Sequence, residues 1–175
     1  AAGKLKHNGR GDLIIGYTGS QQDQSKLEAT CELFTRANIQ CLISDNIKGE
    51  LWAKLIINCA YNAISALTQS NYTSMMSNQL IKDMMISVVE ECQAIVKADG
   101  IKLPNENILE PVLALANSMG NAVSSTAQDL ARGKATEIDA FNGYVMRRGL
   151  ALGVPTPVNT TLYSLVKHLE KSLVK

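Results

Sequence analysis

The chain has 175 residues, of which 46% are hydrophobic and 19% are charged, and 17 basic residues against 16 acidic ones give a net charge of +1. This composition is typical of a folded globule with a sizeable core, and it excludes a disordered, collagen-like or disulfide-dense chain. The balanced charge lacks the basic excess on which phosphate-backbone binding depends, so we expect no nucleic-acid partner.

The most apolar stretch, residues 51–67, contains Lys54, Asn58 and Asn62. A membrane-spanning helix needs about 20 mostly apolar residues, so we expect no membrane partner. The chain has four cysteines, which are widely spaced and never form a CxxC pair: Cys31, Cys41, Cys59 and Cys92. This spacing indicates reduced thiols and a cytoplasmic location. With only two histidines, we also expect no metal site.

The first part of the chain alternates between strand and helix patterns. Residues 12–18 and 39–44 are short apolar runs typical of strands, and residues 22–37 between them carry apolar side chains at helical spacing. The pattern predicts a β-α-β unit. One such unit is too small to be stable alone, so we expect it to be the end of a larger sheet domain.

From residue 48 onward the strand pattern disappears and long helical patterns follow. The predicted helices cover residues 48–67, 78–99, 107–120, 124–132, 136–152 and 157–173. Gly100 and Gly153 follow two of these helices, as glycines at helix ends do.

A narrow polar stripe crosses the helix predicted over residues 48–67. Lys54, Asn58 and Asn62 recur every four residues and therefore share one face, while the other faces are apolar. A lysine on such a helix can act as a proton donor. The stripe is equally typical of a lysine that reaches solvent and asparagines that tie helices together.

A second polar concentration covers residues 124–139. Ser124 or Ser125 is expected to cap one helix, and Glu137 and Asp139 to favour the positive end of the next. Gly143 is predicted in mid-helix, which indicates close approach of another helix or a ligand. The basic residues nearer the C-terminus are expected to be solvated and without a functional role: Arg147, Arg148, Lys167 and His168.

These segments together resemble the ketopantoate reductases. The residues that carry the resemblance are Trp52, Lys54, Asn58, Asn62, Ser124, Ser125, Gln128, Asp129, Thr136, Glu137, Asp139, Asn142, Gly143, Gly149, Gly153, Pro155, Pro157, Asn159, Leu162 and Lys167. The resemblance covers nearly everything from Asp45 onward, and the ordered succession of several motifs makes coincidence improbable.

The resemblance implies a mainly α fold: a helical C-terminal domain of the 6-phosphogluconate dehydrogenase-like type, preceded by a β-α-β remnant of a Rossmann domain. Residues 1–47 would be the C-terminal remnant of the NADP-binding Rossmann domain, and residues 48–175 the helical substrate-binding and dimerisation domain. Most of the cofactor domain would then be missing from this chain, and we expect a fragment that is inactive alone. A homodimer is expected for the complete protein.

The resemblance also implies an activity, the NADPH-dependent reduction of 2-dehydropantoate (ketopantoate) to pantoate in pantothenate and coenzyme A synthesis. Lys54 matches the family's catalytic lysine, which would donate a proton to the ketone oxygen. Glu137 matches the active-site glutamate, which would position the lysine and accept a hydrogen bond from a substrate hydroxyl, and it is also a candidate cofactor contact. Asn58, Asn62 and Ser125 match substrate-binding positions. The site would lie in the cleft between the two domains.

The chain departs from the family pattern at two asparagines. Tyr72 and Ala122 occupy the matching positions, with Asn71 and Asn121 directly before them. The departures leave a related NADPH-dependent 2-oxo acid reductase as one alternative. The other is a non-catalytic helical dimerisation module, in which Lys54 and Glu137 would serve only structure.

Overall fold

The computed structural model describes residue 3 and residues 11–19 and 23–173. The chain divides into two compact units, residues 1–50 and 51–175, and each is described by itself. Across the described residues, no helix is both long enough and apolar enough to cross a membrane.

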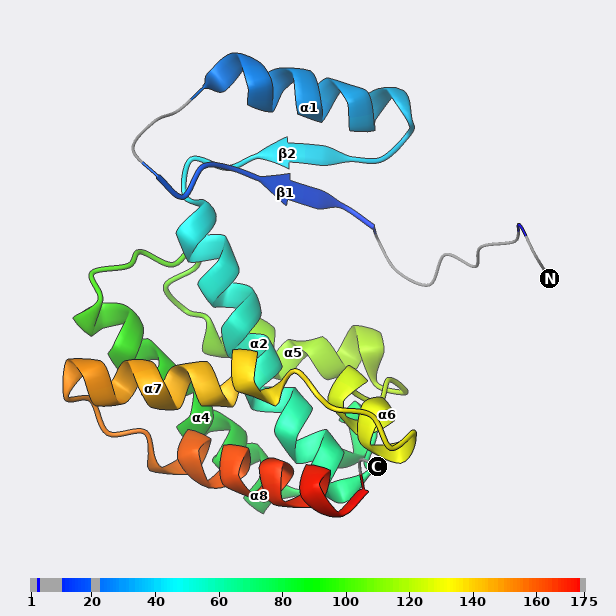
Figure 1. Ribbon diagram of the computed structural model, residues 1–175, viewed down its shortest axis with the longest axis vertical. Coiled ribbons are helices and arrows are strands. Elements are labelled where there is room, and N and C mark those ends of the chain that lie inside the picture. The colour runs from blue at the N-terminus through cyan, green and yellow to red at the C-terminus, as the bar shows by residue number, and fades with distance from the viewer. Residues whose placement is uncertain (1–2, 4–10, 20–22, 174–175) are drawn as a thin grey trace. The chain divides into compact units, whose positions relative to one another are not determined.

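The first unit contains strand β1 (Leu13–Ile15), helix α1 (Gln24–Arg36) and strand β2 (Cys41–Ile43). The strands pair in parallel, with Leu13 opposite Cys41, and α1 lies along them (Figure 1). The predicted β-α-β unit is therefore confirmed, although both strands are shorter than expected. At the end of β1, a Cβ on Gly16 would lie 2.6 Å from the carbonyl oxygen of Ser44, so the chain there tolerates only glycine.

The second unit is helical, which confirms the mainly α fold class. The helices are α2 (Ile47–Thr68), which begins in the first unit, α3 (Tyr72–Ser77), α4 (Gln79–Ala98), α5 (Leu109–Met119), α6 (Ser125–Ala131), α7 (Asn142–Leu152) and α8 (Pro157–Leu173), with a short 3₁₀ turn, η1 (Ile138–Ala140). Helix α8 packs against α4, α6, α7 and η1. Five of the six predicted helices form within about two residues of their expected bounds.

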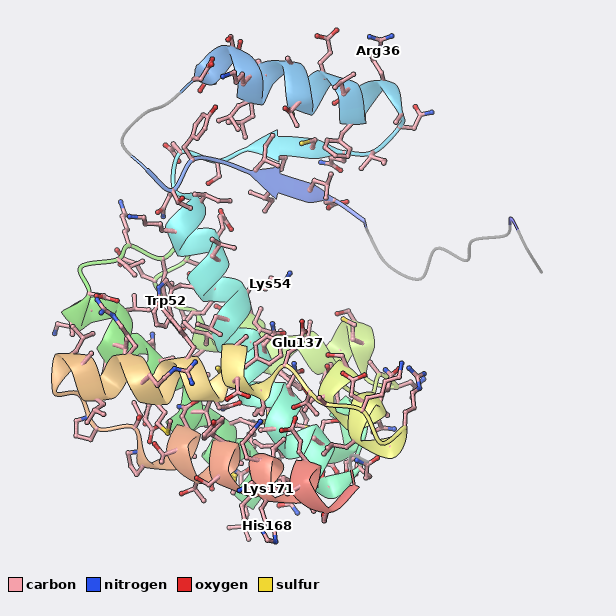
Figure 2. The ribbon with its side chains drawn as sticks, in the orientation of Figure 1. Arg36, Trp52, Lys54, Glu137, His168 and Lys171 are labelled. Carbon is pink, nitrogen blue, oxygen red and sulfur yellow. The ribbon has the colours of Figure 1, made fainter. Side chains whose placement is uncertain are left out.

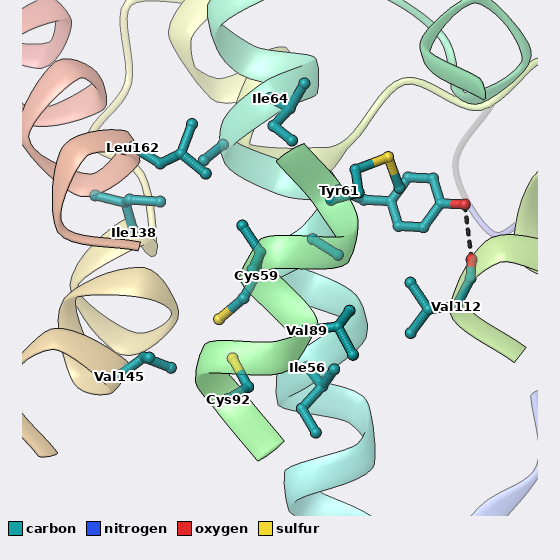
Figure 3. Packing of buried hydrophobic residues seen from close by; sticks show 14 of the residues in the cluster. Ile56, Cys59, Tyr61, Ile64, Val89, Cys92, Val112, Ile138, Val145 and Leu162 are labelled. Carbon is teal, nitrogen blue, oxygen red and sulfur yellow. Dashed lines mark hydrogen bonds between the residues drawn. The ribbon is translucent and has the colours of Figure 1, made fainter. Parts of the chain in front are cut away.

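Helix α2 contributes many of the buried side chains of the core. Ile56 and Cys59 of this helix are fully buried, and Figure 3 shows them facing Val89 and Cys92 of α4. The Tyr61 hydroxyl donates to the carbonyl oxygen of Val112 at 2.8 Å, which joins α2 to α5. Burial raises the pKa of Tyr61 to about 12. A helix packed this closely holds its side chains at fixed spacing.

The prediction of one helix over residues 136–152 is wrong. The chain forms η1, breaks at Phe141 (φ −104°, ψ −105°) and only then enters α7. Tertiary hydrogen bonds explain the break: the Asn142 Nδ2 group donates to the Cys59 carbonyl oxygen at 3.3 Å and to Asn159 Oδ1 at 2.9 Å. Asn142 is fully buried, so these bonds outweigh the propensity of the segment for regular helix.

The glycine expectations are largely confirmed. Gly143 lies at the second position of α7 rather than in mid-helix, and a Cβ there would lie 2.8 Å from Cε2 of Tyr163 on α8. The close approach of another helix is therefore present. Gly100 and Gly153 follow α4 and α7 with φ values of 65° and 68°, in the left-handed region that favours glycine.

Candidate active site

Helix α2 carries Lys54, Asn58 and Asn62 one turn apart, at intervals of about 6 Å along the axis. Their exposure falls along this stripe: Lys54 is exposed, Asn58 is half-buried and Asn62 is only 5% exposed. Figure 2 shows the Lys54 side chain extending outward from α2. The stripe therefore runs from a surface cation down to an amide in the core.

The five residues predicted for the site do not hydrogen bond to one another through their side chains in the part of the chain that the structure describes. Among the described residues the Lys54 ammonium has no carboxylate partner within 4.0 Å, Glu137 included. Both side chains are exposed and available to a ligand.

Helix α6 is fastened to α2 through Ser124. The Ser124 hydroxyl accepts from Ala127 N at 3.1 Å as the helix cap and donates to the Asn62 carbonyl oxygen at 3.2 Å. Ser124 N also donates to the Ser65 hydroxyl at 3.2 Å. Of the two cap candidates, Ser124 is therefore the cap. The next residue, Ser125, is exposed in the first turn of α6, on a helix held against the buried end of the polar stripe.

Glu137 precedes η1 and is exposed. The bond from Asn142 to the Cys59 carbonyl oxygen attaches the following helix to α2 one residue after Asn58. The structure thus ties the Ser125 and Glu137 segments separately to the same helix. An ammonium, a carboxylate, amides and a hydroxyl are the groups that recognise a small oxo acid carrying a hydroxyl.

Three basic residues that were expected to be merely solvated have specific partners. Lys167 pairs with Glu170 and Asp139 at 2.6 and 2.9 Å, and these carboxylates raise the pKa of its ammonium. Arg147 donates to the Asp139 carbonyl oxygen at 2.7 Å. Arg148 donates to the Asp99 carboxylate, which lowers the pKa of Asp99.

The sequence interpretation also missed Glu170, which is only 7% exposed. Tyr163, Lys167 and Glu170 are spaced i, i+4 and i+7, which puts them on one face of α8. That spacing of polar side chains is the signal in the sequence that could have indicated a shared role, whereas the expectation for Lys167 is a solvated side chain.

The start of helix α1 in the first unit does not fit the phosphates of a dinucleotide. Such phosphates bind to free backbone N–H groups at a helix N-terminus, where a negative charge is favoured. At α1 this position is taken by Asp23, whose carboxylate accepts from Lys26 N at 3.3 Å and from the Ser25 hydroxyl at 2.7 Å. The hydrogen bonds from Ser25 and Lys26 lower the pKa of Asp23, so a charged carboxylate opposes a phosphate there.

Comparison with known proteins places this helical fold in one class. Residues 46–170 match the family model described as "Ketopantoate reductase PanE/ApbA C terminal". The chain belongs to the ketopantoate reductase family.

The similar curated proteins are named 2-dehydropantoate 2-reductase, and they are about twice as long as this chain. The 2-dehydropantoate 2-reductase of Pyrobaculum aerophilum is 37% identical over 146 residues, which cover 83% of this chain and 52% of the relative. That of Pyrococcus abyssi is 31% identical and covers 97% of this chain and 56% of the relative. The chain therefore spans about half the length of the curated relatives it matches.

Solved structures agree on the fold. A PanE/ApbA family ketopantoate reductase from Ralstonia eutropha superposes with a TM-score of 0.87 and 43% identity, covering 96% of this chain and 54% of that one. A D-mandelate dehydrogenase solved with NADH and anilino(oxo)acetate superposes with a TM-score of 0.89 and 23% identity, covering 96% of this chain and 70% of that one, which shows a shared fold alone.

Proposed function

We propose that this chain is the substrate-binding and catalytic part of an NADPH-dependent 2-dehydropantoate 2-reductase, which converts ketopantoate to pantoate. The observation that carries the proposal is the Lys54 ammonium, which is exposed and free of carboxylate partners among the described residues, on a core helix with two amides one and two turns below it. Membership of the ketopantoate reductase family supports it.

In the proposed reaction bound NADPH would supply a hydride to the ketone carbon, and Lys54 would supply a proton to the ketone oxygen. A positioned cation stabilises the negative charge that develops on this oxygen, and it then supplies the proton that completes the alcohol. Glu137 accepts a hydrogen bond from the substrate hydroxyl and orients the Lys54 ammonium when substrate is bound. Glu137 is also our candidate for contact with the cofactor.

Three further side chains bind the substrate in this proposal. Asn58, Asn62 and Ser125 supply amide and hydroxyl donors to the carboxylate and the hydroxyl tail of 2-dehydropantoate. The attachment of α6 to the Asn62 carbonyl oxygen supports their acting together, because it holds Ser125 on a helix fixed to α2.

The proposal assigns most of the NADPH site to the half of the relatives that this chain does not cover. The carboxylate of Asp23 at the start of α1 supports this assignment. We accordingly propose residues 1–47 as part of a cofactor domain, residues 48–175 as the substrate domain, and no turnover by residues 1–175 alone. NADPH oxidation by that isolated chain would contradict the last point.

The proposal also includes a cytoplasmic homodimer. One structural neighbour, a ketopantoate reductase from Staphylococcus aureus that is 21% identical and has a TM-score of 0.77, is described as dimeric. Dimerisation through the helical domain is the arrangement we propose for this protein, and sedimentation of the complete gene product tests it.

The decisive test is 2-dehydropantoate-dependent NADPH oxidation by the product of the complete gene. Lys54→Ala is expected to lower kcat by roughly 10²- to 10⁴-fold, the range for loss of a general acid, with an unchanged circular dichroism spectrum. Lys97→Ala, which removes an exposed lysine in the last turn of α4, serves as the matched control and is expected to retain activity. Equal activity of the two variants would refute the assignment of Lys54.

A related reductase for another 2-oxo acid is the second candidate, and Asn71 favours it. The Asn71 side chain caps α3, with its Oδ1 accepting from Ser74 N at 2.9 Å, so it is already committed to a structural role. Activity with another 2-oxo acid but not with 2-dehydropantoate would select this candidate. A gene product that folds but does not bind NADPH would instead be the non-catalytic dimerisation module.

A further inference from the structure

Three side chains of α8 form hydrogen bonds to the residues on both sides of Glu137: Tyr163, Lys167 and Glu170. The segment they hold, residues 136–139, comes from a part of the sequence 24 to 34 residues away. It is a turn and the start of η1 rather than regular helix, so its backbone position depends on tertiary contacts.

On one side of Glu137, the Glu170 carboxylate holds Thr136. Its Oε1 accepts from Thr136 N at 2.7 Å and from the Thr136 hydroxyl at 2.6 Å. The Thr136 hydroxyl in turn accepts from Ile138 N at 3.2 Å. Burial raises the pKa of Glu170, but the hydrogen bonds from Lys167 and Thr136 outweigh it and hold the pKa below its ordinary value. The carboxylate is thus charged at neutral pH.

On the other side, the Asp139 carboxylate is held by two residues of α8. The Tyr163 hydroxyl donates to Oδ1 at 2.7 Å, and Lys167 Nζ donates to Oδ2 at 2.9 Å. The same ammonium lies 2.6 Å from Glu170 Oε2. One lysine therefore links the anchors on both sides of Glu137.

Glu137 itself is exposed and makes no side-chain contact of this kind with any described residue. Its neighbours at positions −1 and +2 are fixed, whereas its own carboxylate is left available. The Glu170 carboxylate is almost fully buried, and burying a charge costs desolvation that a well-packed apolar residue would avoid, so stability alone is a weak reason for a carboxylate at this place.

We infer that Glu170 and Lys167 are positioning residues, which hold the backbone of residues 136–139 so that the Glu137 carboxylate is presented to substrate in one geometry. The inference rests on the proposed function, because Glu137 has a role only if a substrate binds beside it. Small displacements of a group that contacts the reacting molecule are costly, so loss of the anchor is expected to reduce turnover.

The test compares two carboxylates that anchor α8 in the complete gene product. Glu170→Gln removes the charge that binds Thr136 and Lys167. Glu91→Gln is the matched control, since Glu91 accepts from Val158 N at 2.8 Å and Asn159 N at 3.0 Å at the other end of the same helix. We expect Glu170→Gln to lower kcat about tenfold or more and Glu91→Gln to lower it less than about twofold, with both assayed well below their Tm.

A second arm asks whether Glu170 acts through Glu137. In a Glu137→Gln background, adding Glu170→Gln is expected to change kcat by less than about twofold, because the group it positions is already absent. Each of three results would overturn the inference. The fold-losses in kcat of Glu137→Gln and Glu170→Gln could multiply in the double variant, Glu170→Gln and Glu91→Gln could lower kcat equally, or Glu137→Gln could retain full activity.

Amide hydrogen exchange separates this inference from the proposed function. Glu170→Gln is expected to accelerate exchange at Thr136 and Ile138, and Glu91→Gln is not. Unchanged exchange at these amides would overturn the anchoring itself. Faster exchange in a protein that reduces no 2-oxo acid would instead refute the proposed function and with it the catalytic purpose of the anchor.

Discussion

Residues of one polar stripe differ in what they can do because their burial differs. Lys54 is exposed, whereas Asn62 is only 5% exposed. The exposed Lys54 side chain can meet a ligand, whereas the Asn62 side chain is enclosed by the core. Asn58 is half-buried and lies between these extremes.

We therefore predict that Asn58→Ala weakens substrate binding more than it slows turnover. Losing one hydrogen bond worth about 0.5 to 1.5 kcal/mol raises KM for 2-dehydropantoate roughly two- to thirteenfold. Steady-state kinetics of the complete gene product measure this change. Asn117→Ala, at an exposed position of α5, is the control and is expected to leave KM unchanged. A KM unaffected by Asn58→Ala would exclude this residue from substrate binding.

At this scale the sequence revealed periodic features and missed those that depend on distant partners. The stripe on α2 could be predicted because residues four apart always share a helix face. Its assignment as a substrate site stays a prediction. The role of Glu170 could not be predicted, because its partner Thr136 is 34 residues away and only the packing of α8 brings them together.

At the scale of elements, α6 is a seven-residue helix that one capping side chain joins to α2. Ser124 is 2% exposed and satisfies hydrogen-bonding groups on both α6 and α2. Ser125, next to it, is exposed. The first of these adjacent serines is structural, and the second is the one that we propose for substrate binding.

We predict that substitution of Ser124 mainly lowers stability, whereas substitution of Ser125 mainly weakens substrate binding. Ser124→Ala removes a helix cap and a buried link to α2, and we expect it to lower the free energy of unfolding by roughly 1 to 3 kcal/mol. Ser125→Ala is expected to leave stability within about 0.5 kcal/mol but to raise KM for 2-dehydropantoate. Urea unfolding and steady-state kinetics measure the two effects. Equal stability of the two variants would show that the cap contributes little.

Element boundaries were predictable where local signals end a helix and failed where tertiary contacts do. The left-handed Gly100 and Gly153 after α4 and α7 are local signals and were recognised. The break at Phe141 was missed because the bonds that cause it join Asn142 to Cys59 and Asn159, which are distant in sequence. Helix α3 was also missed, since its six residues carry too short a pattern.

For the molecule as a whole, the mainly α architecture and the β-α-β unit followed from hydrophobic periodicity, and the family resemblance was confirmed by comparison. What periodicity could not supply is the set of polar links that join the helices of the second unit. Several of these links end on carboxylates, including Glu170 at Thr136 and Asp99 at Arg148. The stability of the helical unit should therefore depend on their charge.

This dependence gives a prediction for acid. Hydrogen bonds from Lys167 and Thr136 outweigh burial at Glu170, and those from Arg148 lower the pKa of Asp99, so both pKa values lie below the ordinary values of 4.5 and 3.8. The charged forms therefore stabilise the fold at pH values above the ordinary pKa values, and this contribution is lost as the pH falls through the lowered pKa values of the folded state.

We expect the Tm to decrease from about pH 6 to about pH 3. The decrease should be smaller in Glu170→Gln, whose residue 170 has no proton to take up in this range. Far-UV circular dichroism follows the transition, with Glu106→Gln at an exposed position as the control. If Glu170→Gln and Glu106→Gln showed the same pH dependence, the buried carboxylate would not contribute to acid stability.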